Sequence, residues 1–188
     1  MKVLFIGHYR EASGYSYASF GYINALVAAG YDVVCRCYKL NNANPTIPEN
    51  ILELEKKSIE GAEVVIQHLL PHNMSYIPGV KNIGLCVHDT SSLKYIEWDR
   101  FLNCMDEVWI PQRDVPFISE IKVPVQYVPH AFDTTRYGKT EESIDVKEAN
   151  GTCIFYTIAE LNIRKNFRDT IIAFHSEFHT NEPATLLI

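Results

Sequence analysis

The sequence contains no long hydrophobic run. No stretch approaches the roughly 18 consecutive apolar residues that a membrane-spanning helix requires, so no transmembrane segment is predicted. The apolar run at residues 3–6 is too short for the core of a signal peptide, and it ends in Gly7 and His8. We therefore expect a cytoplasmic protein.

An excess of basic residues is also missing. The chain has 17 Lys and Arg against 23 Asp and Glu, for a net charge of −6, and its basic residues are scattered. Because nucleic-acid phosphates are bound by clustered Lys and Arg, a nucleic-acid partner is not expected.

Metal-binding motifs are absent as well. The 5 cysteines form no CxxC pair, and the histidines show neither HxH nor HExxH spacing. We expect no bound metal, and we expect thiols buried in a reducing compartment rather than disulfides.

What the sequence does contain is a repeated strand–helix pattern. A short apolar run at 2–6 predicts a strand. Apolar and small residues then recur along one helical face from 15 to 29, and Gly30 ends that helix before a second strand at 32–38. A strand, a helix and a strand in this order predict a βαβ unit with parallel strands.

The pattern continues to about residue 130. Six strands with intervening helices predict an α/β protein with a doubly wound, mostly parallel, Rossmann-like sheet, in which ligands bind at the carboxyl ends of the strands. The further elements are strands at 63–68, 81–87, 107–110 and 125–128 and helices at 48–58, 93–105 and 116–120.

The domain organisation follows from a change in composition after this sheet. We assign residues 1–133 to a first domain, the polar and aperiodic residues 134–151 to a linker, and residues 152–188 to the start of a second α/β domain. We expect that second domain to be incomplete. Its elements are a strand at 153–158, a helix at 167–178 and an apolar run at 184–188.

Residues 152–188 carry an apolar face that no complete domain covers. We expect them to be poorly protected in hydrogen exchange, to pack on the first domain, or to associate with a second copy of the chain. Uniformly deep protection of this segment in a dilute monomer would contradict that expectation.

Candidate site residues lie where strands end. The loop after the first strand has neither the GxGxxG fingerprint nor a GxxxxGK[ST] loop. Gly14 nevertheless stands at a predicted helix N-terminus, where backbone N–H groups and the helix dipole can hold an anion. The alternative is that Gly14 only forms the turn. The strand-end loops are 7–14, 68–72, 88–90, 111–113 and 130–133.

His88 follows a strand and precedes a predicted helix. A histidine there can donate to a sugar hydroxyl or a phosphate, or it can be a hydrogen-bonded structural residue. Asp89 is expected to cap its helix and Asp133 to shape a turn, and no nucleophile-elbow motif supports a covalent hydrolase. The alternatives given for His88 also hold for His68, His72 and His130.

Two further groups of side chains have open roles. Arg164 and Lys165 precede a predicted helix, where cations oppose the dipole unless an anion such as a diphosphate is bound, and the alternative is a solvated face. Trp98 and Trp109 are expected to pack in the core. Three loop tyrosines can either pack or stack on an acceptor: Tyr9, Tyr15 and Tyr17.

Five segments, in order, are similar to the retaining glycosyltransferases of family 4, which have the GT-B fold. The first strand with its loop to Gly14 resembles that family's first βα unit. Residues 86–89 resemble its strand ending in His-Asp. Residues 105–111 resemble a strand of that family that ends in Pro, and residues 128–133 resemble the family's Val-Pro segment before the linker. Residues 155–174 resemble the opening of the family's donor domain.

The resemblance implies two Rossmann-like domains, the first for the acceptor and the second for a nucleotide-activated sugar. Gly14 would face the donor phosphates or the acceptor, His88 would contact the transferred sugar as the catalytic residue, and Lys165 would neutralise the leaving diphosphate. The nucleotide-sugar is a substrate, and neither cofactor nor metal is implied. The acceptor, a sugar, a lipid-linked sugar or a protein, stays open.

The chain departs from the family's pattern in three places. Ala159 and Glu160 stand where the family has glycine and arginine, so Arg164 would have to substitute. His130 and Ala131 replace the commoner Asn-Gly. The family's pair of glutamates, with seven residues between them, would lie beyond residue 188, so we expect a fragment with little or no transferase activity.

Two other classes of function remain open. A non-catalytic binding or assembly module with the same fold is consistent with Glu160 and with the missing glutamate pair. Another Rossmann-like enzyme, such as an epimerase or dehydrogenase, is disfavoured because the first loop lacks the glycine fingerprint.

Overall fold

The computed structural model describes residues 1–40, 42, 45–88, 90–132, 134 and 146–188. By the contacts between its residues, the chain divides into two compact units, Met1–Tyr137 and Gly138–Ile188. Most of the predicted linker at 134–151 lies outside the described residues. Its described end includes a short 3₁₀ helix, η5 (Lys147–Ala149).

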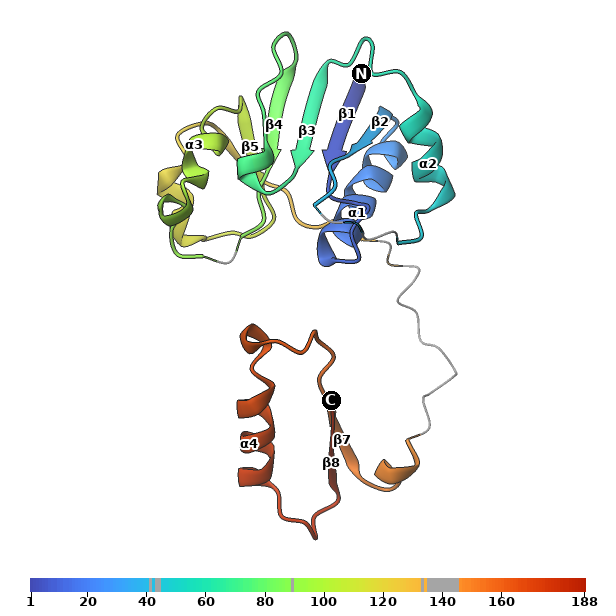
Figure 1. The fold of residues 1–188 in the computed structure, drawn as a ribbon, viewed down its shortest axis with the longest axis vertical. Helices are drawn as coiled ribbons and strands as arrows, with labels where there is room; N and C mark the ends of the chain where they lie inside the picture. The colour runs from blue at the N-terminus through green and yellow to red at the C-terminus, as the bar shows by residue number, and fades with distance from the viewer. Residues whose placement is uncertain (41, 43–44, 89, 133, 135–145) are drawn as a thin grey trace. The chain divides into compact units, whose positions relative to one another are not determined.

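The first unit is built on a parallel sheet, which confirms the predicted α/β, Rossmann-like fold (Figure 1). Its described strands follow the order β2-β1-β3-β4-β5-β6, so the chain reverses direction across the sheet after β2. Every pairing between neighbours is parallel. The strands are β1 (Lys2–Gly7), β2 (Asp32–Cys37), β3 (Val64–His68), β4 (Lys81–Leu85), β5 (Glu107–Ile110) and β6 (Val125–Tyr127).

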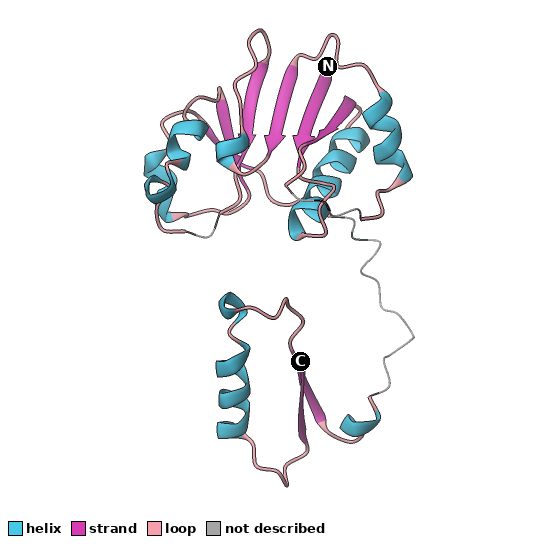
Figure 2. Cartoon of the chain, in the orientation of Figure 1, coloured by secondary structure: helices cyan, strands magenta, loops and turns pink. Residues whose placement is uncertain are grey.

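Helices and 3₁₀ turns connect these strands, as Figure 2 shows in cyan. The expected helix at 93–105 is wrong in detail, because Glu97 has the left-handed conformation (φ 56°) and divides it into η2 (Lys94–Ile96) and α3 (Trp98–Leu102). The other elements are α1 (Gly14–Ala28), α2 (Glu49–Lys56), η1 (Pro71–Asn73) and η3 (Pro116–Glu120).

The core lies on both faces of the sheet, as alternating strand residues require. Phe5 and Ile66 belong to a buried cluster with Ile23 of α1 and Ile51 of α2. A second cluster joins strand β5 to α3, to η3 and to the residues on either side of η1. Its most buried members are Cys86, Leu93, Leu102, Val108 and Phe117.

Helix α1 also holds the segment that follows β6. A Cβ added to Gly21 would lie 1.8 Å from the carbonyl oxygen of Ala131, so only glycine lets this segment cross the helix. The Tyr22 hydroxyl, 3.3 Å from the carbonyl oxygen of Val128 and 3.1 Å from Nδ1 of His130, ties down the same segment.

The second unit is a βαβ element. Strands β7 (Cys153–Tyr156) and β8 (Ala184–Leu187) pair in parallel, and η6 (Ile163–Lys165) and α4 (Phe167–Glu177) lie between them in the chain. The rings of Phe155, Phe174 and Phe178 pack together.

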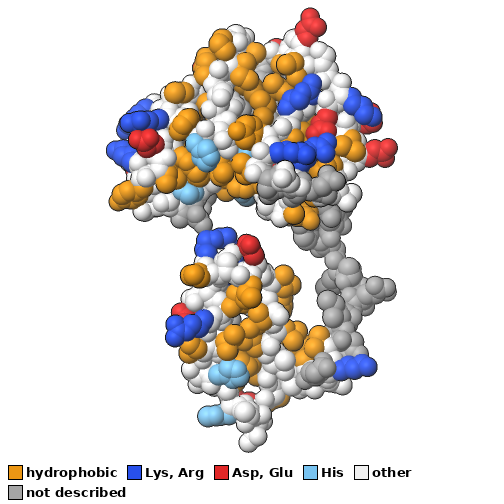
Figure 3. All heavy atoms as spheres, in the orientation of Figure 1, with side chains coloured by type: hydrophobic (Ala, Val, Ile, Leu, Met, Phe, Trp, Pro, Cys, Tyr) orange, Lys and Arg blue, Asp and Glu red, His pale blue; other side chains and the backbone are white. Residues whose placement is uncertain are grey.

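Much of the apolar surface of this unit is exposed, and Figure 3 shows hydrophobic side chains on its surface. Four aliphatic or aromatic side chains are at least 72% exposed: Tyr156, Ile158, Leu161 and Ile163. This exposure agrees with the expected apolar face of residues 152–188. The protection of the segment in hydrogen exchange stays a prediction.

The cysteines only partly match their expected burial. All are free thiols, and burial raises the pKa of the Cys35 and Cys86 thiols to about 12. Cys104 and Cys153, however, are exposed. The expectation of buried thiols is therefore wrong for these two.

Candidate functional site

The carboxyl ends of β1, β3 and β4 bring histidines to one edge of the first sheet. Gly7 pairs with His68 in the parallel register, so His8 lies one residue beyond the end of β3. His88 follows β4, and His72 lies in η1 after β3. This edge is where an open α/β sheet binds its ligands.

His8 is a structural residue of this edge. It is fully buried, and its Nε2 accepts a hydrogen bond from the Leu70 amide (3.1 Å). Nδ1 must then carry the proton that is donated to the Tyr38 carbonyl oxygen at 2.7 Å. Burial lowers the pKa of His8, although the bond to Tyr38 acts in the opposite direction.

His68 is the most strongly perturbed histidine. Its ring is fully buried, and Nδ1 lies 2.8 Å from the Ser19 hydroxyl of α1. Within the described part of the chain, its Nε2 has no hydrogen-bond partner. Burial, with smaller contributions from His130 and His8, lowers the pKa of His68 to about 3, so the ring is neutral at physiological pH.

Tyr15 connects the first loop to the end of β4. Its ring stacks on His68 with 5.0 Å between centroids, and its hydroxyl donates to the carbonyl oxygen of Val87 at 3.3 Å. The residue after Gly14 therefore contacts the residue before His88. The two candidate residues thus come from neighbouring segments of one edge.

Gly14 is the first residue of α1, as predicted from its position. A Cβ added there would meet no atom of the described residues within 4 Å. Ser13 caps the helix without a side-chain hydrogen bond in the described structure, and the first turn has no acidic residue. These backbone N–H groups can therefore face an anion.

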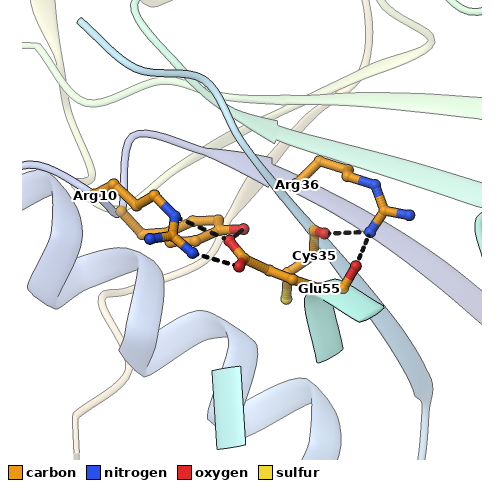
Figure 4. Close-up of polar contacts among 5 residues, drawn as sticks. Arg10, Cys35, Arg36 and Glu55 are labelled. Atoms are coloured by element: carbon orange, nitrogen blue, oxygen red, sulfur yellow. Dashed lines mark hydrogen bonds and ion pairs between the residues drawn. The ribbon is translucent and has the colours of Figure 1, made fainter. Parts of the chain in front are cut away.

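The first loop is anchored to α2 by a partly buried polar cluster, shown in Figure 4. Glu55 accepts hydrogen bonds from the Tyr9 hydroxyl (2.7 Å) and from the guanidinium of Arg10. Burial alone would raise the pKa of Glu55, but these bonds outweigh it and the pKa is lowered. Arg36 donates to the carbonyl oxygens of Cys35 and Glu55, both at 2.7 Å.

The three loop tyrosines differ in burial. Tyr9 is fully buried, so it packs in the core and does not stack on an acceptor. Tyr15 is half-buried against His68. Tyr17 is 71% exposed.

A cluster of three rings lies beside the end of β4. The Trp98 ring is 4.5 Å from that of His88 and 5.8 Å from that of His72, measured between centroids. The indole N–H of Trp98 donates to Nδ1 of His72 at 3.1 Å. Sequence reasoning assigned Trp98 to the core alone and missed this contact, because the spacing of 26 residues gives no local signal.

In the second unit, Arg164 and Lys165 close η6 just before α4. The Lys165 amide donates to Oδ1 of Asn162 at 3.1 Å, and Asn166 has the left-handed conformation (φ 52°). A shallow hollow of about 480 Å³ adjoins this turn. It is lined by Leu161, Asn162, Ile163, Asn166, Phe167, Arg168 and Asp169.

The predicted site residues thus fall into two groups. Gly14 and His88 belong to the first unit, and Arg164 and Lys165 belong to the second. Asp89 and Asp133 lie outside the described residues. Among the residues that the structure does describe, no group of three or more His, Cys, Asp or Glu side chains could hold a metal ion.

No model of a known protein family matches this chain, and no curated protein matches it. In the described part of the protein, no helix is long and apolar enough to cross a membrane. The residues themselves therefore carry the functional argument.

Proposed function

We propose that this chain forms the acceptor-side domain and the beginning of the donor domain of a retaining glycosyltransferase. The observation that carries the proposal is the hydrogen bond from Tyr15 to Val87, which joins the N-terminus of α1 to the strand end before His88. An anion-accepting helix end and a histidine at one sheet edge suit a phosphorylated sugar.

In the proposed reaction, the bond between the anomeric carbon and the nucleoside diphosphate breaks, and a glycosidic bond to the acceptor oxygen forms on the same face. The acceptor's proton passes to a phosphate oxygen, and the diphosphate leaves. Stabilising the charge of that leaving group is the largest electrostatic task. In the second unit, Lys165 with Arg164 beside it supplies positive charge for a diphosphate. In the first unit, His88 donates to a hydroxyl of a bound sugar.

The test is a titration of UDP- and GDP-sugars into the protein expressed from its complete reading frame. We expect saturable binding that the Lys165→Ala variant weakens by about tenfold or more, because a charge-assisted contact to phosphate is lost. His88→Ala should lower turnover more than it lowers nucleotide affinity, since His88 contacts the sugar rather than the nucleotide.

Lys147→Ala is the matched control, because Lys147 is an exposed cation of η5 in the same unit and does not line the hollow beside Lys165. Its effect should be small. Absence of saturable binding by any nucleotide-sugar would overturn the proposal and favour a non-catalytic binding or assembly module. The apolar surface of the second unit is the observation that supports that second candidate, since it leaves a face for association.

A further inference from the structure

Trp98 is held in a fixed orientation at the edge of the first sheet. Part of its ring packs against the buried cluster around Leu93 and Leu102. Its N–H is bound to His72, and its ring contacts the ring of His88. The side chain remains only partly buried, so an aromatic surface is left at this edge.

The bond from Trp98 also determines what His72 presents to solvent. Nδ1 of His72 accepts the indole N–H, so the proton of the neutral ring lies on Nε2. The His72 side chain is exposed. An aromatic surface and an N–H donor therefore stand next to each other.

The backbone before Trp98 is in a costly conformation. Glu97 has φ 56°, a region that non-glycine residues rarely adopt because it strains the backbone. This turn interrupts the helical pattern expected at 93–105 and starts α3 at Trp98. The strained residue Glu97 thus directly precedes Trp98, whose side chain points to His72 and His88.

We propose that Trp98 and His72 form the subsite for a pyranose ring of the acceptor, a proposal that rests on the function proposed above. A pyranose has an apolar face of C–H groups and a rim of hydroxyls. The C–H face packs on the indole, and one hydroxyl accepts the Nε2–H of His72. The subsite lies against His88, the residue assigned to the transferred sugar, so the two reacting sugars would meet there.

The experiment uses tryptophan fluorescence. The chain has 2 Trp residues, and Trp109→Phe leaves Trp98 as the only tryptophan. Methyl α-glucopyranoside, methyl β-galactopyranoside and methyl α-mannopyranoside are titrated into this variant. We expect a saturable change in Trp98 emission with at least one glycoside.

Affinity for that glycoside is then measured by calorimetry in variants of the full chain. Trp98→Ala should weaken binding about tenfold, and His72→Ala by several-fold. Trp98→Phe keeps a ring for stacking but loses the hydrogen bond to His72, so it should weaken binding no more than His72→Ala does. Its difference from Trp98→Ala separates stacking from a loss of folding. Tyr95→Ala is the matched control, since Tyr95 is 84% exposed on the same segment and should leave affinity unchanged.

The inference is wrong if none of the glycosides binds the unchanged chain, if Trp98→Ala binds as well as wild type, or if free nucleosides compete for the Trp98 signal. These results are separate from the nucleotide-sugar titration. If a glycoside binds at Trp98 but no nucleotide-sugar binds, the proposed transferase is wrong and the sugar subsite is supported. If the protein binds a nucleotide-sugar but no glycoside changes the Trp98 emission, the subsite is wrong and the proposed transferase stands.

Discussion

Replacing Gly21 with alanine is expected to lower the free energy of unfolding of the first unit by about 2 kcal/mol or more. The added Cβ would lie 1.8 Å from the carbonyl oxygen of Ala131, and that atom belongs to the backbone, so no side-chain rotation relieves the clash. The segment after β6 would have to leave α1 and give up the contacts of Tyr22 with His130 and Val128. This cost exceeds the gain in helix propensity of about 1 kcal/mol.

Urea denaturation followed by tryptophan fluorescence measures this effect, because Trp98 and Trp109 both belong to the first unit. Gly14→Ala is the matched control: it lies in the same helix, and its Cβ would meet no described atom within 4 Å. Its stability should be unchanged or slightly raised. Equal stability of the Gly21→Ala variant and wild type would show that Ala131 does not cross α1 this closely.

Acidification is expected to destabilise the first unit through His68. The pKa of His68 is about 3 in the folded state and near 6.5 in the unfolded chain. Between these values the unfolded chain binds the extra proton, so the free energy of unfolding falls as the pH drops below about 6.5. His68 alone accounts for a loss of about 2 kcal/mol at pH 5. His8, whose pKa burial also lowers, acts in the same direction.

His68→Asn isolates this contribution. The asparagine amide can still bond to the Ser19 hydroxyl, but it takes up no proton. The stability of this variant should fall less steeply between pH 6.5 and 5, by about 1 kcal/mol per pH unit on average. Urea titrations at several pH values, with tryptophan fluorescence, measure the slope. Parallel slopes for variant and wild type would mean that His68 titrates normally in the folded protein.

The strands and the first helix could be predicted from local pattern alone. The strand runs are short, apolar and bounded by turn residues, and Gly30 marks the end of α1 with a positive φ of 84°. These signals act within a few residues, so they survive without tertiary context. The parallel pairing followed from the same alternation of strands and helices.

The places where prediction failed depend on distant contacts. The helix expected at 93–105 is broken at Glu97, where the side chain of the next residue is held by His72 from η1. The sequence pattern allows Tyr9 a binding role, but its hydroxyl donates to Glu55, which lies 46 residues away in the chain. The burial of His68 likewise arises from α1 and β1 packing around it.

The sequence by itself determined that the chain alternates strands with helices, that its first sheet is parallel, that Gly14 stands at a helix N-terminus, and that His88 follows a strand. Periodicity and turn chemistry encode those features within a few neighbouring residues. Only the tertiary structure decided which side chains at that edge are buried anchors and which remain exposed, since that depends on packing between segments far apart in the chain. His8, His68 and Tyr9 became buried anchors, whereas Trp98 stayed half-buried and His72 stayed exposed.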